Sequence, residues 1–504
     1  MQTLPVLLIF CFLCFPLFSQ EDGGPNSDSV FIINSFEFNI DGFTRPYALI
    51  NKGDLIKGEI ITGLSNLEKY IQEKTQALYN ERVLESVEIN YTVAQVQEDG
   101  MYPVDLVINI KDTWNIVAIP RPRYSSNTGF DITLKARDYN FLGTMSPLRL
   151  DLGYIYDEKG RNSLILELDS NIPFRAFGLN WNIKFFNAFN YRPDTGQPFY
   201  YRNITGLSVE LPVKFTAITI GFDESILIND ENADIYKPLY GNFQDGFYMS
   251  SNPYIAWKIP TGIEAGEWGE LVYTPGISAT LNHEFPAWPL DDIRKGPFLT
   301  FSHTLGFRHI DWIGNFQRGL DVFIYNSFNS DFFNYDRGAN PLKADLKLSG
   351  IGHFIVNNFL AISSRVMYRQ WFYMEQASMQ TSSGDALRGI LDKDINADYM
   401  LSLNLDFPAR VLKFSPSVWF NNPILRIFNF DLHLSPIIDT ALYHDPVKNI
   451  DFNFKNILVT GGMEAVIFPE FFRSLYLRIS FGWNLTDFSG GRNSEIYIGT
   501  DFHY

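Results

Sequence analysis

Short runs in which apolar and polar residues alternate recur along most of this chain. One run places Leu148, Leu150, Leu152, Tyr154 and Tyr156 on the same face of an expected strand. Similar runs lie at 164–169, 401–407 and 475–483. Beyond residue 20, no stretch holds about 18 uninterrupted apolar residues, so the pattern does not predict helical membrane spans. Strands with one apolar and one polar face suit a barrel with lipid outside and water inside.

A soluble β-sandwich is the alternative that alternation alone leaves open. Its outward face would be the polar one, and each sheet would need a second sheet over its apolar face. In a membrane every backbone polar group must be paired, so strands there close into a barrel. At about 24 residues for each strand with its connection, residues 120–504 would supply about 16 strands. The expected fold is therefore mainly β, with a transmembrane antiparallel β-barrel of about 16 strands.

The carboxyl-terminal residues continue this alternation to the end of the chain. Tyr497, Gly499, Phe502 and Tyr504 follow one another as aromatic, glycine, aromatic and terminal aromatic. This order is similar to the terminal signal of bacterial outer-membrane β-barrels. An ordinary amphipathic last strand is the alternative interpretation.

The amino-terminal segment, residues 1–20, predicts a secretory signal. It carries no charged side chain, and its apolar core at 7–15 is too short to span a bilayer. Lipidation at Cys14 is less favoured, because Phe12-Leu13 in front of it is a poor lipobox. Both cysteines lie in this segment, so the expected mature chain offers no disulfide, thiol catalyst or cysteine-based metal site.

Residues 30–112 show a different pattern of expected secondary structure from the rest of the chain. A strand at 31–41 precedes a capping-box pattern, in which Ser65 would cap a helix and Glu68 would reach back to it. Two further strands are expected at 83–91 and 104–110. The order strand, helix, strand, strand resembles one POTRA domain (a polypeptide-transport-associated module). A generic α+β domain is the alternative.

A POTRA-like domain followed by a barrel resembles the BamA/TamA outer-membrane assembly superfamily, and three internal motifs carry the resemblance further. Residues 138–144 are similar to the family's turn after the first barrel strand, with Met145 where a second glycine is usual. Residues 436–441 are similar to its Phe-x-Asp-x-Gly strand, with Ala441 in place of the glycine. The third motif resembles the family's Val-Arg-Gly-Tyr/Phe loop and consists of Leu387, Arg388, Gly389 and Ile390.

The resemblance implies a role for each motif. The loop arginine of the family folds into the lumen and pairs with the strand aspartate, so Arg388 is expected to pair with Asp439. A guanidinium matches a carboxylate as a planar fork of donors. The resemblance also implies a seam between the first and last strands that opens sideways. We place the first strand at about 128–136 and the last at 495–504, with seam residues Gly129, Phe130, Ile132 and Leu134. Gly129 would loosen the seam because it has no side chain to pack.

The function that the resemblance implies is folding or insertion of other β-barrels in the bacterial outer membrane, with the POTRA-like domain in the periplasm. The expected partners are the lipid bilayer, unfolded outer-membrane protein clients, and periplasmic or lipoprotein helpers. A net charge of -17 argues against nucleic-acid partners. We predict no enzyme, cofactor or metal, because the seven histidines are scattered and no Gly-x-Ser-x-Gly elbow occurs.

Two alternative functions stay open. A two-partner secretion translocator would export a polypeptide through the barrel, and such proteins share the arginine-glycine and aspartate motifs. They usually carry two POTRA domains and a plug helix, whereas residues 21–29 are too short and too rich in helix breakers for a plug. A passive porin is the third candidate, but it would have no need of a POTRA-like domain.

Overall fold

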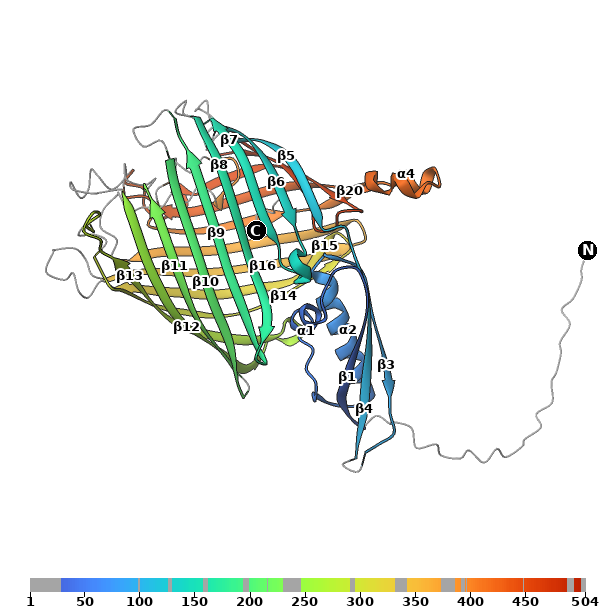
Figure 1. Cartoon of the computed structure of the whole chain (residues 1–504). Helices are drawn as coiled ribbons and strands as arrows, with labels where there is room; N and C mark the ends of the chain where they lie inside the picture. The colour runs from blue at the N-terminus through green and yellow to red at the C-terminus, as the bar shows by residue number, and fades with distance from the viewer. Residues whose placement is uncertain are drawn as a thin grey trace, which may run out of the picture.

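The computed structural model describes residues 29–97, 100–125, 129–156, 162–193, 199–214, 216–229, 246–290, 295–330, 342–372, 386–390, 395, 397–446, 448–486 and 494–499. It has two parts, a small amino-terminal α+β unit and a large β-barrel beside it (Figure 1). The prediction of a mainly β fold is confirmed. Within the described ranges, no helix is both long enough and apolar enough to cross a membrane.

The amino-terminal unit packs two helices against a four-stranded sheet. The sheet has the order β2-β1-β4-β3, with β1 and β4 parallel and the other neighbours antiparallel. Its core contains Phe31, Leu67, Leu78 and Ile108, all fully buried. Its elements are β1 (Val30–Asp41), α1 (Pro46–Lys52), β2 (Ile60–Thr62), α2 (Leu64–Asn80), β3 (Leu84–Val93) and β4 (Met101–Asp112).

The predicted capping box in this unit is wrong. Helix α2 begins at Leu64, and its N-cap is Gly63 with φ +91° and no side-chain cap hydrogen bond. Ser65 therefore lies inside the first turn. The chain enters the helix from the short strand β2, which pairs with β1, and the helix starts two residues before the pattern would place it. Helix α1 and strand β2 have no counterpart in the sequence-based prediction.

In the part of the chain that the structure describes, nineteen strands, β5 to β23, form the barrel in chain order, and β23 lies beside β5 so that the order is circular. They are β5 (Ile116–Ser125), β6 (Gly129–Asp138), β7 (Leu148–Tyr156), β8 (Asn162–Ala176), β9 (Leu179–Tyr191), β10 (Phe199–Val213), β11 (Thr216–Ile228), β12 (Phe247–Glu264), β13 (Glu270–His283), β14 (Phe298–Ile313), β15 (Phe316–Ser330), β16 (Leu342–Asn357), β17 (Leu360–Phe372), β18 (Tyr399–Asp406), β19 (Ala409–Phe414), β20 (Phe430–His444), β21 (Leu458–Pro469), β22 (Leu477–Asn484) and β23 (Ser494–Gly499).

The predicted count of about 16 strands is too low. Strands β18 and β19 lie in line, because both pair with β17 on one side and with β20 on the other. The number of strand positions around the barrel is therefore one fewer than nineteen, which is even, as antiparallel closure requires. The error arose from the assumed chain length per strand, since several turns between strands are only two residues long.

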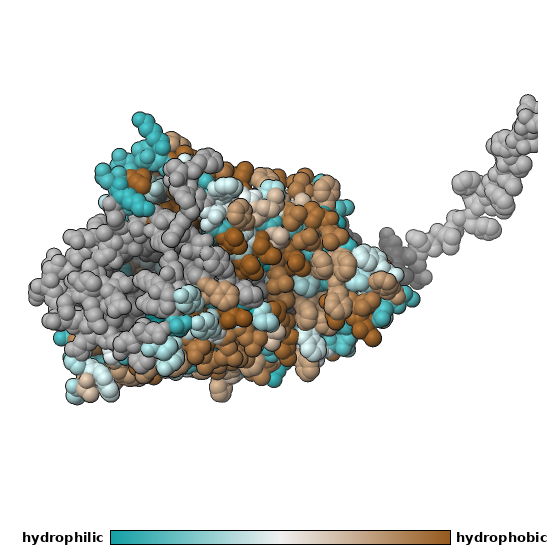
Figure 2. Space-filling view, turned by 90° about the horizontal axis from the view of Figure 1, so that it is seen from above, coloured by the Kyte–Doolittle hydropathy of each residue, from teal (hydrophilic) through white to brown (hydrophobic). Residues whose placement is uncertain are grey.

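Apolar side chains cover the outside of the barrel wall. On β6 and β7, Ile132 stands opposite Tyr154 and Leu134 opposite Leu152, and all four are exposed. The pattern continues to the other side of the seam, where Ile479, Phe481 and Ile498 are exposed as well. Figure 2 shows this apolar surface over the barrel wall. Polar residues of the same strands, such as Thr133 and Arg478, are buried on the inner face. The alternation in the sequence thus has its apolar side outward, opposite to a soluble sandwich.

The structure corrects the predicted first strand. Gly129, Phe130, Ile132 and Leu134 lie on β6, which is flanked by β5 and β7, so none of them is at the seam. The first strand is β5, which begins at Ile116, slightly before the predicted barrel boundary at residue 120. Prolines at 120 and 122 disfavour a strand interior, but a strand at the edge of a sheet can hold them.

The amino-terminal unit docks at the barrel end that carries the short turns. The turns between β8 and β9, β14 and β15, and β16 and β17 are each two residues long. The Tyr47 hydroxyl donates to the carbonyl of Pro173 in β8 at 3.2 Å, and Asn80 donates to Asp311 in β14 at 2.8 Å. The longer connections, such as those from β11 to β12 and from β17 to β18, join strand ends at the opposite end.

Arg45 and Arg82 make further contacts that fix this docking. The backbone N–H of Arg45 donates to the carbonyl of Gly143, in the loop between β6 and β7, at 2.9 Å. A Cβ at Gly143 would lie 2.2 Å from the Phe43 carbonyl oxygen, so only glycine fits there. The guanidinium of Arg82 lies 4.2 Å from the ring of Trp312 and donates to the Arg473 carbonyl at 2.6 Å. Burial, together with the nearby Arg473 cation, lowers the pKa of Arg82 to about 10.

Candidate functional site: the inner arginine loop and the strand seam

Arg388 and Asp439 form a buried bidentate pair inside the barrel. Nε and Nη2 of Arg388 donate to the two carboxylate oxygens of Asp439 at 3.0 and 2.6 Å. The backbone N–H of Arg388 donates to the same carboxylate at 2.9 Å. The two residues are 5% and 1% exposed, so water screens the pair little. This is the pairing that the motif resemblance implied, and it attaches the loop at 386–390 to strand β20.

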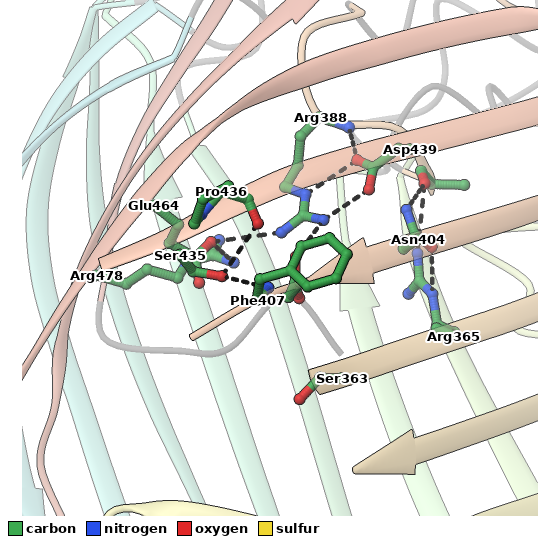
Figure 3. Close-up of polar contacts among 12 residues, drawn as sticks. Ser363, Arg365, Arg388, Asn404, Phe407, Ser435, Pro436, Asp439, Glu464 and Arg478 are labelled. Carbon is green, nitrogen blue, oxygen red and sulfur yellow. Dashed lines mark hydrogen bonds and ion pairs between the residues drawn. The ribbon is translucent and has the colours of Figure 1, made fainter. Parts of the chain in front are cut away.

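Two more carboxylates share the charge of Arg388. Asp406, at the end of β18, forms an ion pair with its Nη2 at 2.6 Å, and Glu464 of β21 lies 3.6 Å from its Nη1. Glu464 also forms an ion pair with Arg478 of β22 at 3.4 Å. Figure 3 shows Arg388 between Asp439 on one side and the Glu464–Arg478 pair on the other. The loop arginine therefore contacts carboxylates of three strands, and Glu464 extends the network to Arg478 of a fourth. The opposite charges offset the cost of burying each ion.

Apolar packing holds the rest of the motif. Leu387 and Ile390 are buried in a cluster with Ile395, Met400 and Tyr443. Ile390 thus occupies an apolar site although the family pattern has an aromatic residue there. The carbonyl of Ala386 accepts from the amide of Asn404 in β18 at 2.9 Å, so the start of the motif is held by hydrogen bonding as well.

Gly389 brings the loop backbone against the last two strands. Its φ is +98°, and a Cβ there would lie 2.5 Å from the backbone nitrogen of Trp483 in β22. Its own N–H donates to the Glu495 carboxylate of β23 at 3.2 Å. The opposing residue, Gly482, has the same restriction, since its Cβ would lie 2.6 Å from the Arg388 carbonyl carbon. Glycine at both positions is what allows the loop to reach the final strand.

We expect Gly389→Ala to displace the loop from β22 and β23. The added methyl group collides with backbone atoms, which cannot move aside as a side-chain tip can, and the positive φ adds strain of about 1 kcal/mol. Proteolysis of the intact protein within 386–390 should become faster. Gly178→Ala is the matched control, because its φ is +76° but a Cβ there meets nothing within 4 Å. Equal cleavage of the two variants would contradict the close contact.

The described part of the carboxyl-terminal signal lies at the seam. Tyr497 points inward on β23, and its ring leans over Gly499, where a Cβ would be 2.2 Å from the tyrosine oxygen. The ring lies between two guanidinium groups, with Arg478 at 4.3 Å and Arg121 of β5 at 5.7 Å. Tyr497 and Gly499 therefore act together, because the tyrosine ring occupies the space that a side chain at 499 would fill. Phe502 and Tyr504 lie outside the described residues, as does the expected signal segment at 1–20.

A side chain of the first strand bonds the backbone of the last across the seam. Arg121 donates from Nε and Nη2 to the Ile498 carbonyl at 3.3 and 3.2 Å, and from Nη2 to the Tyr497 hydroxyl at 3.0 Å. Together with Arg478 and Glu464, this continues the polar network from Arg388 to β5. The seam and the arginine loop are thus connected through contacts between successive neighbours.

Two prolines weaken the edge of the first strand. Pro120 and Pro122 lie in β5, yet its pairing with β6 is regular from Ile116 to Ser125. In an antiparallel pair, alternate residues point their N–H groups toward one neighbour and the rest point away. Since the ladder with β6 tolerates both prolines, their missing N–H groups belong to the edge that faces β23. This edge therefore lacks two successive donors, and Arg121 between them supplies side-chain donors instead.

Sequence reasoning missed several residues of this site. Asp406, Glu464 and Glu495 are strand carboxylates that look like many others, and only the folded barrel brings them to the loop. The prolines of β5 did carry a signal, because two prolines at alternate positions indicate an edge strand. Among the described residues, no group of three or more His, Cys, Asp or Glu side chains is placed to hold a metal ion.

Comparison with known proteins gives remote structural similarities. No protein-family model matches the chain, and no curated protein matches it. The chain is similar to BamA from Haemophilus ducreyi lacking POTRA domains 1–3, with a TM-score of 0.40 and 14% identity over 94% of this chain and 85% of that chain. It is similar to CdiB from Acinetobacter baumannii, with a TM-score of 0.45 and 12% identity over 93% and 73% of the two chains. CdiB from Escherichia coli gives a TM-score of 0.41 and 10% identity over 96% and 92%. At these TM-scores and identities, the similarities do not assign the chain to a family.

Proposed function

We propose that this chain spans the bacterial outer membrane and helps to fold or insert other β-barrel proteins there. The apolar outer wall supports the membrane location, because soluble proteins rarely expose so large an apolar surface to water. Outer-membrane barrels have short periplasmic turns and longer external loops. The amino-terminal unit docks at the short-turn end, which favours a POTRA-like role in the periplasm, where it would receive clients and helper proteins.

The seam carries the proposal for assembly. A barrel hides every strand edge except where its first and last strands meet. The edge of β5 lacks the N–H groups of Pro120 and Pro122, so fewer backbone bonds have to break before β23 separates from it. Once β23 is free, its backbone donors and acceptors offer a template for an incoming client strand, which adds by β-augmentation. No covalent chemistry is needed.

The arginine loop has a bracing role in this mechanism. Arg388 joins β18, β20 and β21, and the adjacent Gly389 contacts Glu495 of β23. The loop thus holds the inner wall on the carboxyl-terminal side of the seam. The contacts Glu464–Arg478 and Arg478–Tyr497 run from the loop to Arg121. Opening of the seam therefore breaks only the contacts that Arg121 makes with β23. The barrel keeps its shape while the seam moves.

Depletion of the protein from its host, followed by quantitative proteomics of the outer membrane, tests the proposed function. Assembly predicts that many β-barrel proteins decline together. Loss of a single secreted polypeptide, with the barrels unchanged, would contradict assembly and favour a two-partner-type translocator. Loss of solute uptake alone would favour a porin. Restoring the chain from a plasmid is the control for effects of the depletion itself.

A further inference from the structure

The connection between β19 and β20 differs from the other turns at the short-turn end. Residues 415–429 form a helical excursion that contains α4 (Pro416–Trp419) and the 3₁₀-helix η7 (Pro423–Phe428). Figure 1 shows α4 projecting beyond the strand ends, away from the barrel wall. The excursion is ordered by its own contacts. The ring of Trp419 packs edge-on against Phe414 at 5.0 Å, and the Asn422 side chain caps η7 by accepting from the N–H of Ile424.

One side of the excursion is polar and faces the protein. Arg426 forms ion pairs with Glu85 of the amino-terminal unit at 2.9 Å and with Glu470 at 3.2 Å. Asn429 is buried and donates to Ser417 and to Glu470. Arg426 and Lys413 line a cavity of about 580 Å³ between the amino-terminal unit and the barrel mouth. Although burial opposes ionisation, Arg426 and Lys111 lower the pKa of Glu85.

The other side of the excursion is apolar and uncovered within the described structure. Val418, Phe420 and Ile424 are 73%, 71% and 77% exposed. We name this surface the apolar ridge, and it consists of Val418, Trp419, Phe420, Ile424, Ile427 and Phe428. The ridge continues onto the barrel, since Val411 and Leu412 of β19 are also exposed and apolar. These two residues lead from the ridge toward the apolar outer wall, and Lys413, which follows them, lines the cavity.

We propose that the apolar ridge lies in the interfacial layer of the same bilayer that surrounds the barrel, in the leaflet on the side of the amino-terminal unit. Its occupant is lipid, because the ridge is continuous with the lipid-facing wall while its polar side is turned inward. Tryptophan beside large aliphatic and aromatic residues is the usual composition of interfacial segments. The inference rests on the proposed membrane location and is independent of the assembly activity.

This arrangement ties the amino-terminal unit to the membrane surface. The Arg426–Glu85 ion pair connects the ridge to β3, so an embedded ridge restricts how far the unit can tilt from the bilayer. A single ion pair at a partly exposed site contributes little energy, about 1 kcal/mol or less. The limit on the tilt of the amino-terminal unit therefore comes mainly from burial of the ridge in lipid. The ion pair determines which part of the unit is held near the ridge.

Lipid quenching tests the ridge directly. A full-length chain with Cys11→Ser and Cys14→Ser carries a single new cysteine, labelled with an environment-sensitive fluorophore and reconstituted into phospholipid vesicles. Lipids brominated on the acyl chain serve as quenchers. We expect Ile424→Cys and Val418→Cys to be quenched clearly, although less than Phe222→Cys in the middle of β11, because an interfacial probe lies shallower than the brominated acyl chains. Glu73→Cys on the exposed face of α2 should stay unquenched.

The controls separate the two proposals. Quenching at 222 without quenching at 424 and 418 would overturn the ridge inference and leave the membrane location intact. That result would fit a ridge that binds a protein partner instead of lipid. Absence of quenching at 222 as well would overturn the membrane location, and the ridge inference with it.

Discussion

Arg388→Ala should lower the free energy of unfolding of the barrel by about 3–5 kcal/mol, the usual result of leaving a buried carboxylate without its partner. Asp439 is 1% exposed, and it would lose both guanidinium bonds at once. Asp406 and Glu464 would remain close by and add like-charge repulsion. Denaturant unfolding of vesicle-embedded protein, followed by tryptophan fluorescence, measures the change.

Two comparisons make this result specific. Arg149→Ala removes another arginine from an aspartate pair, with Asp169 at 3.1 Å, but that side chain is 54% exposed. Its loss should be no more than about 1 kcal/mol. Arg388→Lys should recover little, because an ammonium cannot form the bidentate fork. A double-mutant cycle with Asp439→Ala gives the coupling energy, and a value below about 0.5 kcal/mol would contradict the role of the pair.

Replacing the two seam prolines by alanine should slow client folding on the order of 30-fold. The double variant Pro120→Ala/Pro122→Ala supplies two backbone donors on the β5 edge that faces β23. Each new hydrogen bond contributes about 1 kcal/mol, so the closed seam gains about 2 kcal/mol. That gain reduces the open population by roughly the stated factor. The rate at which a reconstituted client acquires its folded, heat-modifiable form is the measurement.

A proline far from the seam provides the control for this variant. Pro275 lies in β13, and its replacement by alanine also adds a donor, but at a strand between two barrel neighbours. Client folding should be unchanged by Pro275→Ala. If both the seam variant and Pro275→Ala fold clients as fast as the unmodified protein, the missing backbone donors of β5 do not control how readily the seam opens.

The sequence predicted those features that depend on local period and on short motifs. Alternation placed Leu152 and Ile479 on the apolar face, and in the structure both are on the outer wall. The loop motif and the strand aspartate could be matched because Arg388 and Asp439 each lie within recognisable surroundings. Predicting these features does not require knowing which distant strands become neighbours in the barrel.

Features that depend on closure could not be predicted in the same way. The first strand was misplaced onto β6. A strand that holds Pro120 and Pro122 is expected only at a sheet edge, and only the circular neighbour order makes β5 an edge. The carboxylates at 406, 464 and 495 converge on the loop from three strands, which no sequence spacing encodes. The excursion at 415–429 has no period of its own, since its two short helical segments present apolar residues through tertiary contacts with β19 and the amino-terminal unit.

Opening of the seam between β5 and β23 is the central claim, and a reversible covalent lock tests it most directly. In the Cys11→Ser/Cys14→Ser chain, a cysteine at Ala118 or Pro120 is paired with one at Ile496 or Ile498, all on the outer face. The pair that oxidises most readily has acceptable disulfide geometry. Client folding in proteoliposomes is then compared between the oxidised protein and the same sample after reduction. We predict folding only in the reduced state, with full recovery on reduction, and equal folding in both states would contradict a seam that opens.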